Sequence, residues 1–221
     1  MIDVVLGVGS NKSWNGMNSL CLLKKACEAL NGLLSEFTVS SVYRTKPMYL
    51  ENQDDFYNMA VRGKIDDSYS PFDLLEKIHV IESCLGRNRE LEVRNGPRSI
   101  DIDIEFFGTQ TVDTKTLQIP HPRHKERAFV LVPLLEILKE NNIKATFFVV
   151  HNNPELLKRI HNEGHTIGLH SASHKYSKIY ASEEAFFADL TEIGDTVERA
   201  TGVRSKIIRF PGGSSNTVSA R

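Results

Sequence analysis

Two different successions of strands and helices follow one another in this chain, and they meet at a helix predicted over residues 128–141. Before this helix, the apolar patterns predict strand, helix, strand, strand, helix and strand, an order typical of α+β domains of the ferredoxin-like type. After it, strands and helices alternate one by one, which predicts parallel βαβ units. With 221 residues the chain is long enough for two modest domains, so we expect an α+β protein whose architecture changes near this helix.

Periodicity and capping signals place the individual elements. One helix is expected to begin at Pro71 with Ser70 as its N-cap. The segment of residues 87–96 is polar and is expected to be a loop. The apolar stripe of the helix that begins at Pro71 is predicted to be Phe72, Leu75, Ile78 and Ile81. Further helices are expected at residues 17–34, 154–163 and 183–201. Strands are expected at residues 4–8, 37–43, 56–61, 99–107, 145–150, 166–169 and 206–209.

The composition is that of an ordinary soluble globular protein. Hydrophobic residues make up 40% of the chain and the formal net charge is -1, so no strong positive field favours nucleic acid or a membrane surface. Three cysteines without close pairing argue against a disulfide framework and favour a reducing compartment. No apolar run approaches the ~20 residues that span a bilayer. We therefore expect a cytoplasmic protein that binds neither nucleic acid nor membranes.

The strand predicted at residues 99–107 carries three acidic side chains at alternate positions. Because side chains alternate across a strand, Asp101, Asp103 and Glu105 should lie on one face and the isoleucines on the other. The first two carboxylates would be roughly 7 Å apart along the strand, a spacing that suits Mg²⁺, which prefers one or two carboxylates together with phosphate oxygens and water. The alternative is a polar strand edge that faces solvent.

Cationic side chains bracket this acidic strand. Carboxylates that attract a metal ion, next to cations that attract phosphate, are what phosphoryl transfer requires. The alternative is a solvated loop that happens to be basic, but this does not explain why the cations flank the two acids. The cations before the pair are Arg87, Arg89, Arg94 and Arg98, and those after it are His121, Arg123, Lys125 and Arg127.

Six segments of residues 1 to about 137 resemble the family of 6-hydroxymethyl-7,8-dihydropterin pyrophosphokinases, in the order and spacing of that family. They are LGVGSN, VSSVYRTKP, DDFYNMAV, LLEKIHVIESCLGRNRE, RNGPRSIDIDIEFFG and IPHPRHKERAFVLVPLLEI, of which GPRSIDIDI with the downstream IPHP is the most specific. The resemblance implies that residues 1–137 form a domain that moves a diphosphate group from ATP to 6-hydroxymethyl-7,8-dihydropterin in folate biosynthesis, with Mg²⁺ as cofactor and these two small molecules as binding partners.

The resemblance also implies roles for single residues. Asp101 and Asp103 correspond to ligands of two Mg²⁺ ions that bridge the ATP phosphates, Arg87 and Arg98 to mobile cations that neutralise charge during the transfer, and His121 to a phosphate contact. The other ATP contacts would be Glu82, Arg89, Ile104 and Arg127; the pterin would stack between Phe56 and Phe129 and hydrogen-bond to Thr45 and Asn58. A flat heterocycle needs stacking faces and a few fixed polar groups, although a single phenylalanine is more often part of a core.

The chain departs from this family at two places. Asn95 stands where many members carry an aromatic residue, which would weaken closure of the loop over ATP. The short C-terminal section of the family, which follows the LVPLLEI segment, is replaced by a different sequence. The second departure marks the expected end of the first domain.

Residues 138–221 resemble polysaccharide deacetylases of the NodB type. The resemblance lies in LKENNIKATFFVV, NEGHTIGLHSASHKYSKIYAS and TGVRSKIIRFPGGSSNTVS, and it implies part of a (β/α) barrel with a Zn²⁺ site. His170 and His174 are spaced as H-x-x-x-H, and on a helical turn two such imidazoles would share a face and could bind one metal ion. The alternative is a chance pair of surface or core histidines.

The zinc site implied by this second resemblance is incomplete. The family takes a third ligand and a catalytic base from two aspartates upstream of the ATFF segment, and LVPLLEI stands at that place instead. A metal site without its carboxylate and base would not activate water. The leading hypothesis is therefore a cytosolic pyrophosphokinase with a non-catalytic appendage; the others are a metal-dependent deacetylase of N-acetylated glycans and a catalytically inactive chimera.

Overall fold

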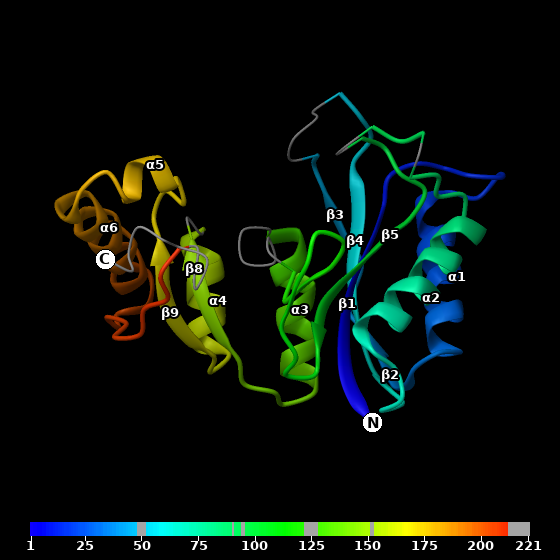
Figure 1. Ribbon diagram of the computed structural model, residues 1–221, viewed down its shortest axis with the longest axis horizontal. Coiled ribbons are helices and arrows are strands. Elements are labelled where there is room, and N and C mark those ends of the chain that lie inside the picture. The colour runs from blue at the N-terminus through cyan, green and yellow to red at the C-terminus, as the bar shows by residue number, and fades with distance from the viewer. Residues whose placement is uncertain (48–51, 90, 94–95, 122–127, 151–152, 212–221) are drawn as a thin grey trace. The chain divides into compact units, whose positions relative to one another are not determined.

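The computed structural model describes residues 1–47, 52–89, 91–93, 96–121, 128–150 and 153–211. They form two compact units, of which the first contains the residues up to 121 together with Phe129–Ile137, and the second contains Ala128 and the residues from Leu138 onward (Figure 1). Both units mix helices with strands, as expected for an α+β protein. Within the described ranges, no helix is long and apolar enough to cross a membrane.

The first unit is built on an antiparallel sheet. Its strands follow the order β2-β4-β1-β5, and β3 also pairs with β4. The strands are β1 (Ile2–Ser10), β2 (Ser35–Val39), β3 (Tyr43–Thr45), β4 (Phe56–Ile65) and β5 (Asp101–Phe107), and a small hairpin of β6 (Val112–Asp113) and β7 (Gln118–Ile119) follows. The helices α1 (Ser19–Asn31) and α2 (Pro71–Cys84) lie on one side of this sheet (Figure 1).

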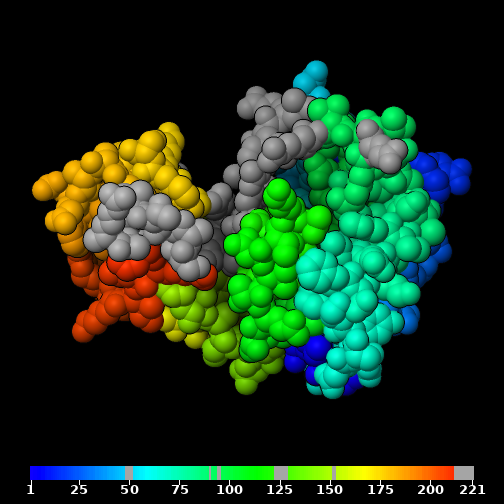
Figure 2. Space-filling model, in the orientation of Figure 1, coloured from blue at the N-terminus to red at the C-terminus, as the bar shows by residue number. Residues whose placement is uncertain are grey.

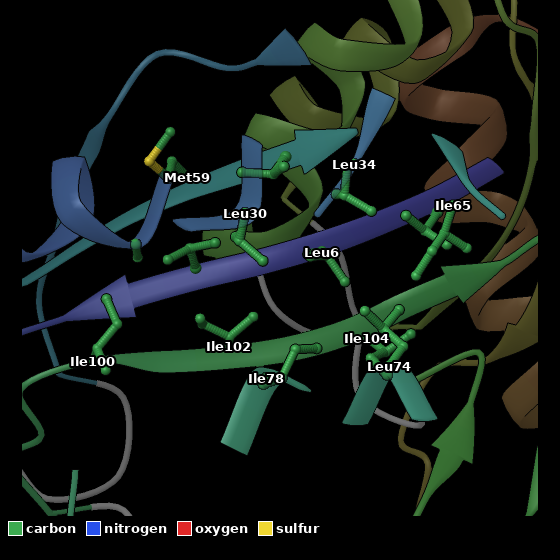
Figure 3. Packing of buried hydrophobic residues seen from close by; sticks show 14 of the residues in the cluster. Leu6, Leu30, Leu34, Met59, Ile65, Leu74, Ile78, Ile100, Ile102 and Ile104 are labelled. Atoms are coloured by element: carbon green, nitrogen blue, oxygen red, sulfur yellow. The ribbon is translucent and has the colours of Figure 1, made fainter. Parts of the chain in front are cut away.

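The apolar face of the sheet packs against these two helices. Leu6 of β1 is fully buried, Ile102 and Ile104 of β5 are almost fully buried, and all three belong to the cluster that contains Leu30 of α1 and Ile78 of α2 (Figure 3). Burial of one such side chain contributes about 1.5–3 kcal/mol. This packing fixes the register of β5, because a slip by one residue would turn its isoleucines away from the core.

Helix α2 begins as expected, but the side that it buries differs from the predicted stripe. Ser70 caps the helix in a capping box with Asp73, and Pro71 is its first residue. Phe72 is 43% exposed, and α2 forms part of the outer surface of the first unit (Figure 2). The buried positions are Pro71, Leu74, Ile78 and Glu82. Of the predicted stripe, Ile78 is confirmed, Leu75 and Ile81 are partly buried against the core, and Phe72 was wrong. Apolar periodicity could not reveal the burial of Glu82, because this residue is a carboxylate.

The single strand expected at residues 37–43 is two strands. The chain leaves the strand conformation between β2 and β3, where Ser40 bonds to Ala60 through its backbone N–H (2.9 Å to the carbonyl oxygen) and through its Oγ, which accepts the Ala60 N–H at 2.9 Å. A serine hydroxyl that replaces a backbone acceptor in this way favours a break in the ladder. β3 can therefore pair with the beginning of β4, beside the candidate site.

Helix α3 (Ala128–Glu140) contains residues of both units. In the first unit, Glu136 accepts hydrogen bonds from the Tyr43 hydroxyl (2.6 Å) and from the Ser41 N–H and hydroxyl (2.9 and 2.8 Å). Three donors on one carboxylate hold the segment between β2 and β3 against the helix. The end of the LVPLLEI segment therefore keeps a specific contact with the first unit.

The second unit contains the expected parallel pair. β8 (Thr146–Val150) and β9 (Thr166–Ser171) are parallel and are joined by α4 (Pro154–Asn162), which Asn153 caps. A short helix α5 (Tyr176–Ile179), which was not expected, precedes α6 (Glu183–Thr201). Helix α6 begins after the N-cap Ser182 and ends at Gly202, whose φ is 74°.

The strand expected at residues 206–209 is not formed as a strand. The described residues show one parallel bridge there, between Leu169 and Ile208, with hydrogen bonds from the Leu169 N–H to the Ile207 carbonyl (2.7 Å) and from the Arg209 N–H to the Leu169 carbonyl (3.0 Å). Ile207 and Ile208 remain 44% and 46% exposed. Little apolar surface is buried by this segment, so little stabilises a longer ladder.

Candidate functional site

The register of three strands brings polar side chains into rows on the sheet face opposite the apolar core. Gly9 of β1 pairs with Asn58 of β4 on one side and with Asp101 of β5 on the other. Paired residues in an antiparallel ladder project to the same face. In the next row, Gly7 pairs with Ala60 and with Asp103. The two aspartates therefore share a face, and Asn58 lies two strands away, at about 10 Å between backbones.

The two glycines leave the middle of each row without a side chain. A Cβ atom on Gly9 would lie 2.8 Å from Oδ1 of Asn58, and one on Gly7 would lie 2.9 Å from Oε1 of Glu105. Real Cβ atoms are not found so close to other heavy atoms, so Asn58 and Glu105 occupy space that only glycine provides. The result is a flat strip of backbone between the amide of Asn58 and the carboxylate of Asp101.

Asp101 is bound by two guanidinium groups. Oδ1 lies 2.9 Å from Nη1 of Arg87, and Oδ2 lies 2.6 Å from Nη1 of Arg98. Burial opposes the charged carboxylate, but the positive charges of Arg98 and Arg87 outweigh it and hold the pKa of Asp101 below its usual value. Asp101 is therefore ionised at neutral pH, as a metal ligand must be.

Arg87 is held by further groups that the sequence did not suggest. Its Nη1 donates to the Ile100 carbonyl at 2.6 Å, and its Nε lies 2.5 Å from Oε2 of Glu92. The side chains of Arg87 and Glu92 are only 8% and 14% exposed. Glu92 lies in the segment that was expected to be a loop, where a charged residue is usually solvated, so no sequence signal pointed to it.

Glu82 connects α2 to the backbone between the two aspartates. Its Oε1 accepts the Ile102 N–H at 2.9 Å, and its Oε2 lies 2.5 Å from Nη2 of Arg89. Burial raises the pKa of Glu82 above its usual value, although Arg89 opposes the shift. Ile104 directs its side chain into the core, so only its backbone, on the open edge of β5, remains to contact a ligand.

Asn11 is a second residue that sequence reasoning missed. It is 3% exposed, and its Oδ1 accepts the backbone N–H of Arg98 at 2.8 Å. Its Nδ2 donates to Oε1 of Gln53 (3.0 Å) and to the carbonyl of Asp54 (3.1 Å). Asn11 therefore connects the end of β1 to the segment before β4 and to Arg98; the turn cluster GSN after the first strand was the available signal.

The residues expected to bind a heterocycle lie next to the same rows. Nδ2 of Asn58 donates to Oγ1 of Thr45 at 2.8 Å, and Thr45 pairs with Phe56 across β3 and β4. The guanidinium carbon of Arg98 lies 6.0 Å from the centre of the Phe56 ring, within range of a cation–π contact. The structure thus brings Thr45, Asn58 and Phe56 together with Arg98.

Three expected residues lie further along the chain. The N–H of His121 donates to the carbonyl of Glu105 at 3.3 Å, which places its backbone beside the end of β5. Phe129 is in the first turn of α3 and is half-buried. Arg127 lies outside the described residues, as do Arg94, Asn95, Arg123 and Lys125.

The two histidines of the second unit are brought together, but not by a helical turn. His170 lies in β9 and His174 follows it with a φ of 48°, so the expectation of a helical pair is wrong; the strand continues to Ser171 and then turns. The ring centres are 5.2 Å apart. Nδ1 of His170 lies 2.6 Å from the carbonyl of Arg209; because a carbonyl only accepts, Nδ1 is the donor in this hydrogen bond.

Asp189 of α6 holds the turn between these histidines. It is 4% exposed, and it accepts hydrogen bonds from the Ser171 hydroxyl (2.6 Å) and from the N–H groups of Ala172 (2.8 Å) and Ser173 (2.9 Å). Burial opposes the charged form, but these hydrogen bonds outweigh it and lower the pKa of Asp189. In the described part of the chain, no three His, Cys, Asp or Glu side chains are grouped so that they could hold a metal ion.

Comparison with known proteins gives two family matches and several relatives. Residues 5–139 match the family of 7,8-dihydro-6-hydroxymethylpterin-pyrophosphokinase (HPPK), and residues 127–221 match the polysaccharide deacetylase family. The 2-amino-4-hydroxy-6-hydroxymethyldihydropteridine pyrophosphokinase of Bacillus subtilis is 49% identical over 108 residues, which are 49% of this chain and 62% of the relative. The enzyme of the same name from Aquifex aeolicus is 38% identical over 137 residues, 62% of this chain and 81% of the relative.

A solved structure matches part of the chain. The catalytic domain of peptidoglycan N-acetylglucosamine deacetylase from Eubacterium rectale is 50% identical in the matched part, which covers 39% of this chain and 41% of that domain, with a TM-score of 0.37. The chain therefore spans less than two thirds of the length of the Bacillus subtilis relative and less than half of this deacetylase domain.

Proposed function

The chain belongs to the 7,8-dihydro-6-hydroxymethylpterin-pyrophosphokinase family, and on that premise we propose that residues 1–137 transfer a diphosphate group from ATP to 6-hydroxymethyl-7,8-dihydropterin in folate biosynthesis. The observation that carries the proposal is the row Asn58–Gly9–Asp101, with Arg87 and Arg98 on the carboxylate. The proposal is supported because Asn58, which is suited to a heterocycle, and Asp101 with its two arginines, which are suited to a metal-bound triphosphate, belong to one row of one sheet.

The two aspartates fit a magnesium site. They occupy alternate positions on one face of β5, and the residues opposite them in β1 are glycines, so no neighbouring side chain of β1 covers them. Asp101 and Asp103 would hold Mg²⁺ together with phosphate oxygens. When bound, the metal ion neutralises part of the phosphate charge and orients the transferred group.

The cationic groups are suited to the phosphates of ATP. Arg87 and Arg98 already converge on Asp101, and a guanidinium binds phosphate as well as it binds a carboxylate. His121 lies beside the end of β5 and is proposed as a further phosphate contact. The rest of the nucleotide is proposed to lie at the edge of β5. There it would contact Glu82, Arg89, Arg127 and the backbone of Ile104.

The pterin is proposed to lie over the strip of backbone beside Gly9. Thr45 and Asn58 would hydrogen-bond its polar edge, and Phe56 and Phe129 would stack on its two faces. In the reaction, the hydroxymethyl oxygen forms a bond to the β-phosphorus of ATP, the bond from that phosphorus to the α-phosphate oxygen breaks, and AMP leaves. The chain's part is to align the two reactants and to stabilise the phosphate charge.

The architecture is proposed to be ferredoxin-like in the first unit and part of a (β/α) barrel in the second. The strand order β2-β4-β1-β5, with α1 and α2 on one side, supports the first assignment, and the parallel β8–α4–β9 unit supports the second. A cytoplasmic location is proposed because the three cysteines are free thiols.

A second candidate function, deacetylation of N-acetylated glycans with Zn²⁺, has support from the neighbouring rings of His170 and His174. The described residues supply no third ligand, so they do not fit a catalytic zinc site. We infer that the second unit is inactive as a deacetylase. Release of acetate from chitooligosaccharide by the purified chain, lost when His170 is replaced by Ala, would overturn this inference.

The proposed transfer is tested by the formation of AMP. Purified, folded protein is incubated with Mg²⁺, ATP and 6-hydroxymethyl-7,8-dihydropterin, and AMP and the pterin product are separated by chromatography. One AMP is expected for each pterin consumed, and AMP formation should need the pterin. No turnover by folded protein would reject the proposal.

A further inference from the structure

We propose that Glu92 is a positioning residue that holds Arg87 at Asp101 and thereby competes with the triphosphate of ATP for this guanidinium. The inference rests on the proposed function of the first unit. It concerns a residue that none of the ATP, Mg²⁺ or pterin roles above includes.

The contacts of Arg87 show what competes for it. Its guanidinium lies between two carboxylates, with Nε at 2.5 Å from Glu92 and Nη1 at 2.9 Å from Asp101. Nη1 also donates to the carbonyl of Ile100. Within the described residues Nε makes no hydrogen bond, so its close contact with Glu92 is one of charge. A phosphate that binds this guanidinium must therefore compete with two carboxylates for its single positive charge.

Glu92 is fixed in place by its own segment. Its Oε1 accepts the backbone N–H of Asn88 at 3.4 Å, and the N–H groups of Leu91 and Glu92 both donate to the Asn88 carbonyl, at 3.2 and 3.1 Å. The carboxylate and the backbone N–H of Glu92 therefore both bond to Asn88, the residue that follows Arg87. The carboxylate reaches Arg87 without ordering a long, free side chain, so the entropic cost of the pair is small.

The pair is also shielded from water. Both side chains are more than four fifths buried, and an ion pair in such a place is stronger than one on the surface. The second partner of Arg98 is different. Its Nε donates to the carbonyl of Gly96 at 3.3 Å, whereas Nε of Arg87 lies beside the carboxylate of Glu92. The two arginines on Asp101 are thus held unequally, and Glu92 makes Arg87 the more firmly held.

Removal of the Glu92 charge is therefore expected to strengthen nucleotide binding. Calorimetry measures the affinity of the full chain for the Mg²⁺ complex of a non-hydrolysable ATP analogue, in the wild type, E92Q, R87A and the double variant R87A/E92Q. E92Q should bind about fivefold more tightly, the equivalent of about 1 kcal/mol of binding free energy. In the R87A background the same change should have no effect, because the competition acts through Arg87.

Two further variants separate this effect from general electrostatics and from folding. E36Q removes the same charge from an exposed residue that pairs with Lys64, and it should leave the affinity unchanged. E92D keeps the charge and should restore affinity toward that of the wild type. If Glu92 only stabilised its turn, E92Q would bind the analogue more weakly, not more tightly.

The outcomes distinguish failure of the role of Glu92 from failure of the proposed function. Equal or weaker binding by E92Q, or an equal gain in R87A, overturns the role of Glu92 while the proposed function stands. Failure of the folded wild-type chain to bind the analogue overturns both. In turnover, the KM for ATP should fall in E92Q by the same factor as the dissociation constant, with kcat unchanged.

Discussion

An aspartate lies at the centre of the candidate site in each unit, and the two carboxylates are bound by different kinds of donor. Asp101 is bound by the side chains of Arg87 and Arg98, whereas Asp189 is bound by two backbone N–H groups and one hydroxyl. Guanidinium groups can change partners when a phosphate or a metal ion arrives. Backbone N–H groups cannot leave without unfolding the turn that they belong to. Asp101 is therefore suited to chemistry, and Asp189 to holding a structure.

The sheets that carry the two sites also differ in how firmly they are packed. Asp101 and Asp103 lie on a strand whose isoleucines are packed into a core shared with α1 and α2. His170 lies on one of two paired strands, next to a segment that forms a single bridge and leaves Ile207 and Ile208 exposed. A functional site needs side chains held by a rigid scaffold, and the first unit supplies more of this than the described part of the second.

The largest effect is expected from D101N. Asparagine keeps the shape of the side chain and one acceptor oxygen for one of the two arginines, so the first unit should keep its fold. Loss of the charge removes a ligand for Mg²⁺, and the rate of AMP formation should fall about 10³-fold, as expected for several kcal/mol of lost transition-state stabilisation. If D101N forms AMP as fast as the wild type, the statement that Asp101 is suited to chemistry is contradicted.

D189A should act on stability instead. It leaves the Ser171 hydroxyl and the N–H groups of Ala172 and Ser173 without their acceptor, which should destabilise the second unit by about 2–4 kcal/mol. Hydrogen exchange of the residue 171–174 amides, or urea unfolding, measures this. D195N changes an exposed aspartate of the same helix, paired with Arg204 at 3.1 Å, and should stay within about 0.5 kcal/mol.

The rate of AMP formation by D189A tests whether the first unit depends on the second. AMP formation should remain close to that of the wild type, because Asp189 takes no part in the proposed transfer. A large loss of AMP formation in D189A would show that the first unit depends on the second. Equal stability of D189A and D195N would show that the hydrogen bonds of Asp189 do not hold the turn.

G9A should affect the pterin more than the nucleotide. A Cβ at this position would lie 2.8 Å from Oδ1 of Asn58, and Asn58 is also held by Thr45, so its amide must move. The KM for the pterin should rise about tenfold, the equivalent of roughly 1.4 kcal/mol, while analogue binding should change little. G32A, at a helical position with a φ of -73° and a nearest contact of 3.4 Å, is the matched control; equal effects in both would contradict the role of Gly9.

The smallest effect is expected in the pH dependence of D189N. The pKa of Asp189 is lowered in the folded protein, so its charge contributes stability that is fully present above the unfolded pKa of about 3.9 and is lost as the pH falls through the lower folded pKa. The stability gap between wild type and D189N should therefore be constant from about pH 5 to pH 7 and should narrow below pH 4. Urea unfolding at a series of pH values measures it; a gap that widens on acidification would contradict the assignment.

The features that sequence reasoning predicted share one property: they depend on neighbours in the chain. The N-cap Ser70, the alternation of Asp101 and Asp103 with buried isoleucines, and the parallel pair after residue 145 all follow from local pattern. The join of two sequences near residue 138 was predicted from their resemblance to two different families, and both family matches confirm it.

The features that it missed depend on register or on unusual burial. No local pattern shows that Gly9 pairs with both Asn58 and Asp101. Nor does it show that charged residues such as Glu82 and Glu92 are nearly buried, since a carboxylate in a helix or a loop is usually solvated. The helical pairing of His170 and His174 was wrong because a spacing of four residues does not distinguish a helix from a strand followed by a turn.

The central claim is that Asp101 binds a divalent cation together with the nucleotide, on the face that it shares with Asn58. The most direct measurement is electron paramagnetic resonance of Mn²⁺, used in place of Mg²⁺, titrated into the full chain with a saturating non-hydrolysable ATP analogue. The account predicts two protein-dependent Mn²⁺ ions for each wild-type chain, and loss of at least one in D101N. The same number of ions in both proteins, or no Mn²⁺ beyond that bound by the free analogue, would contradict it.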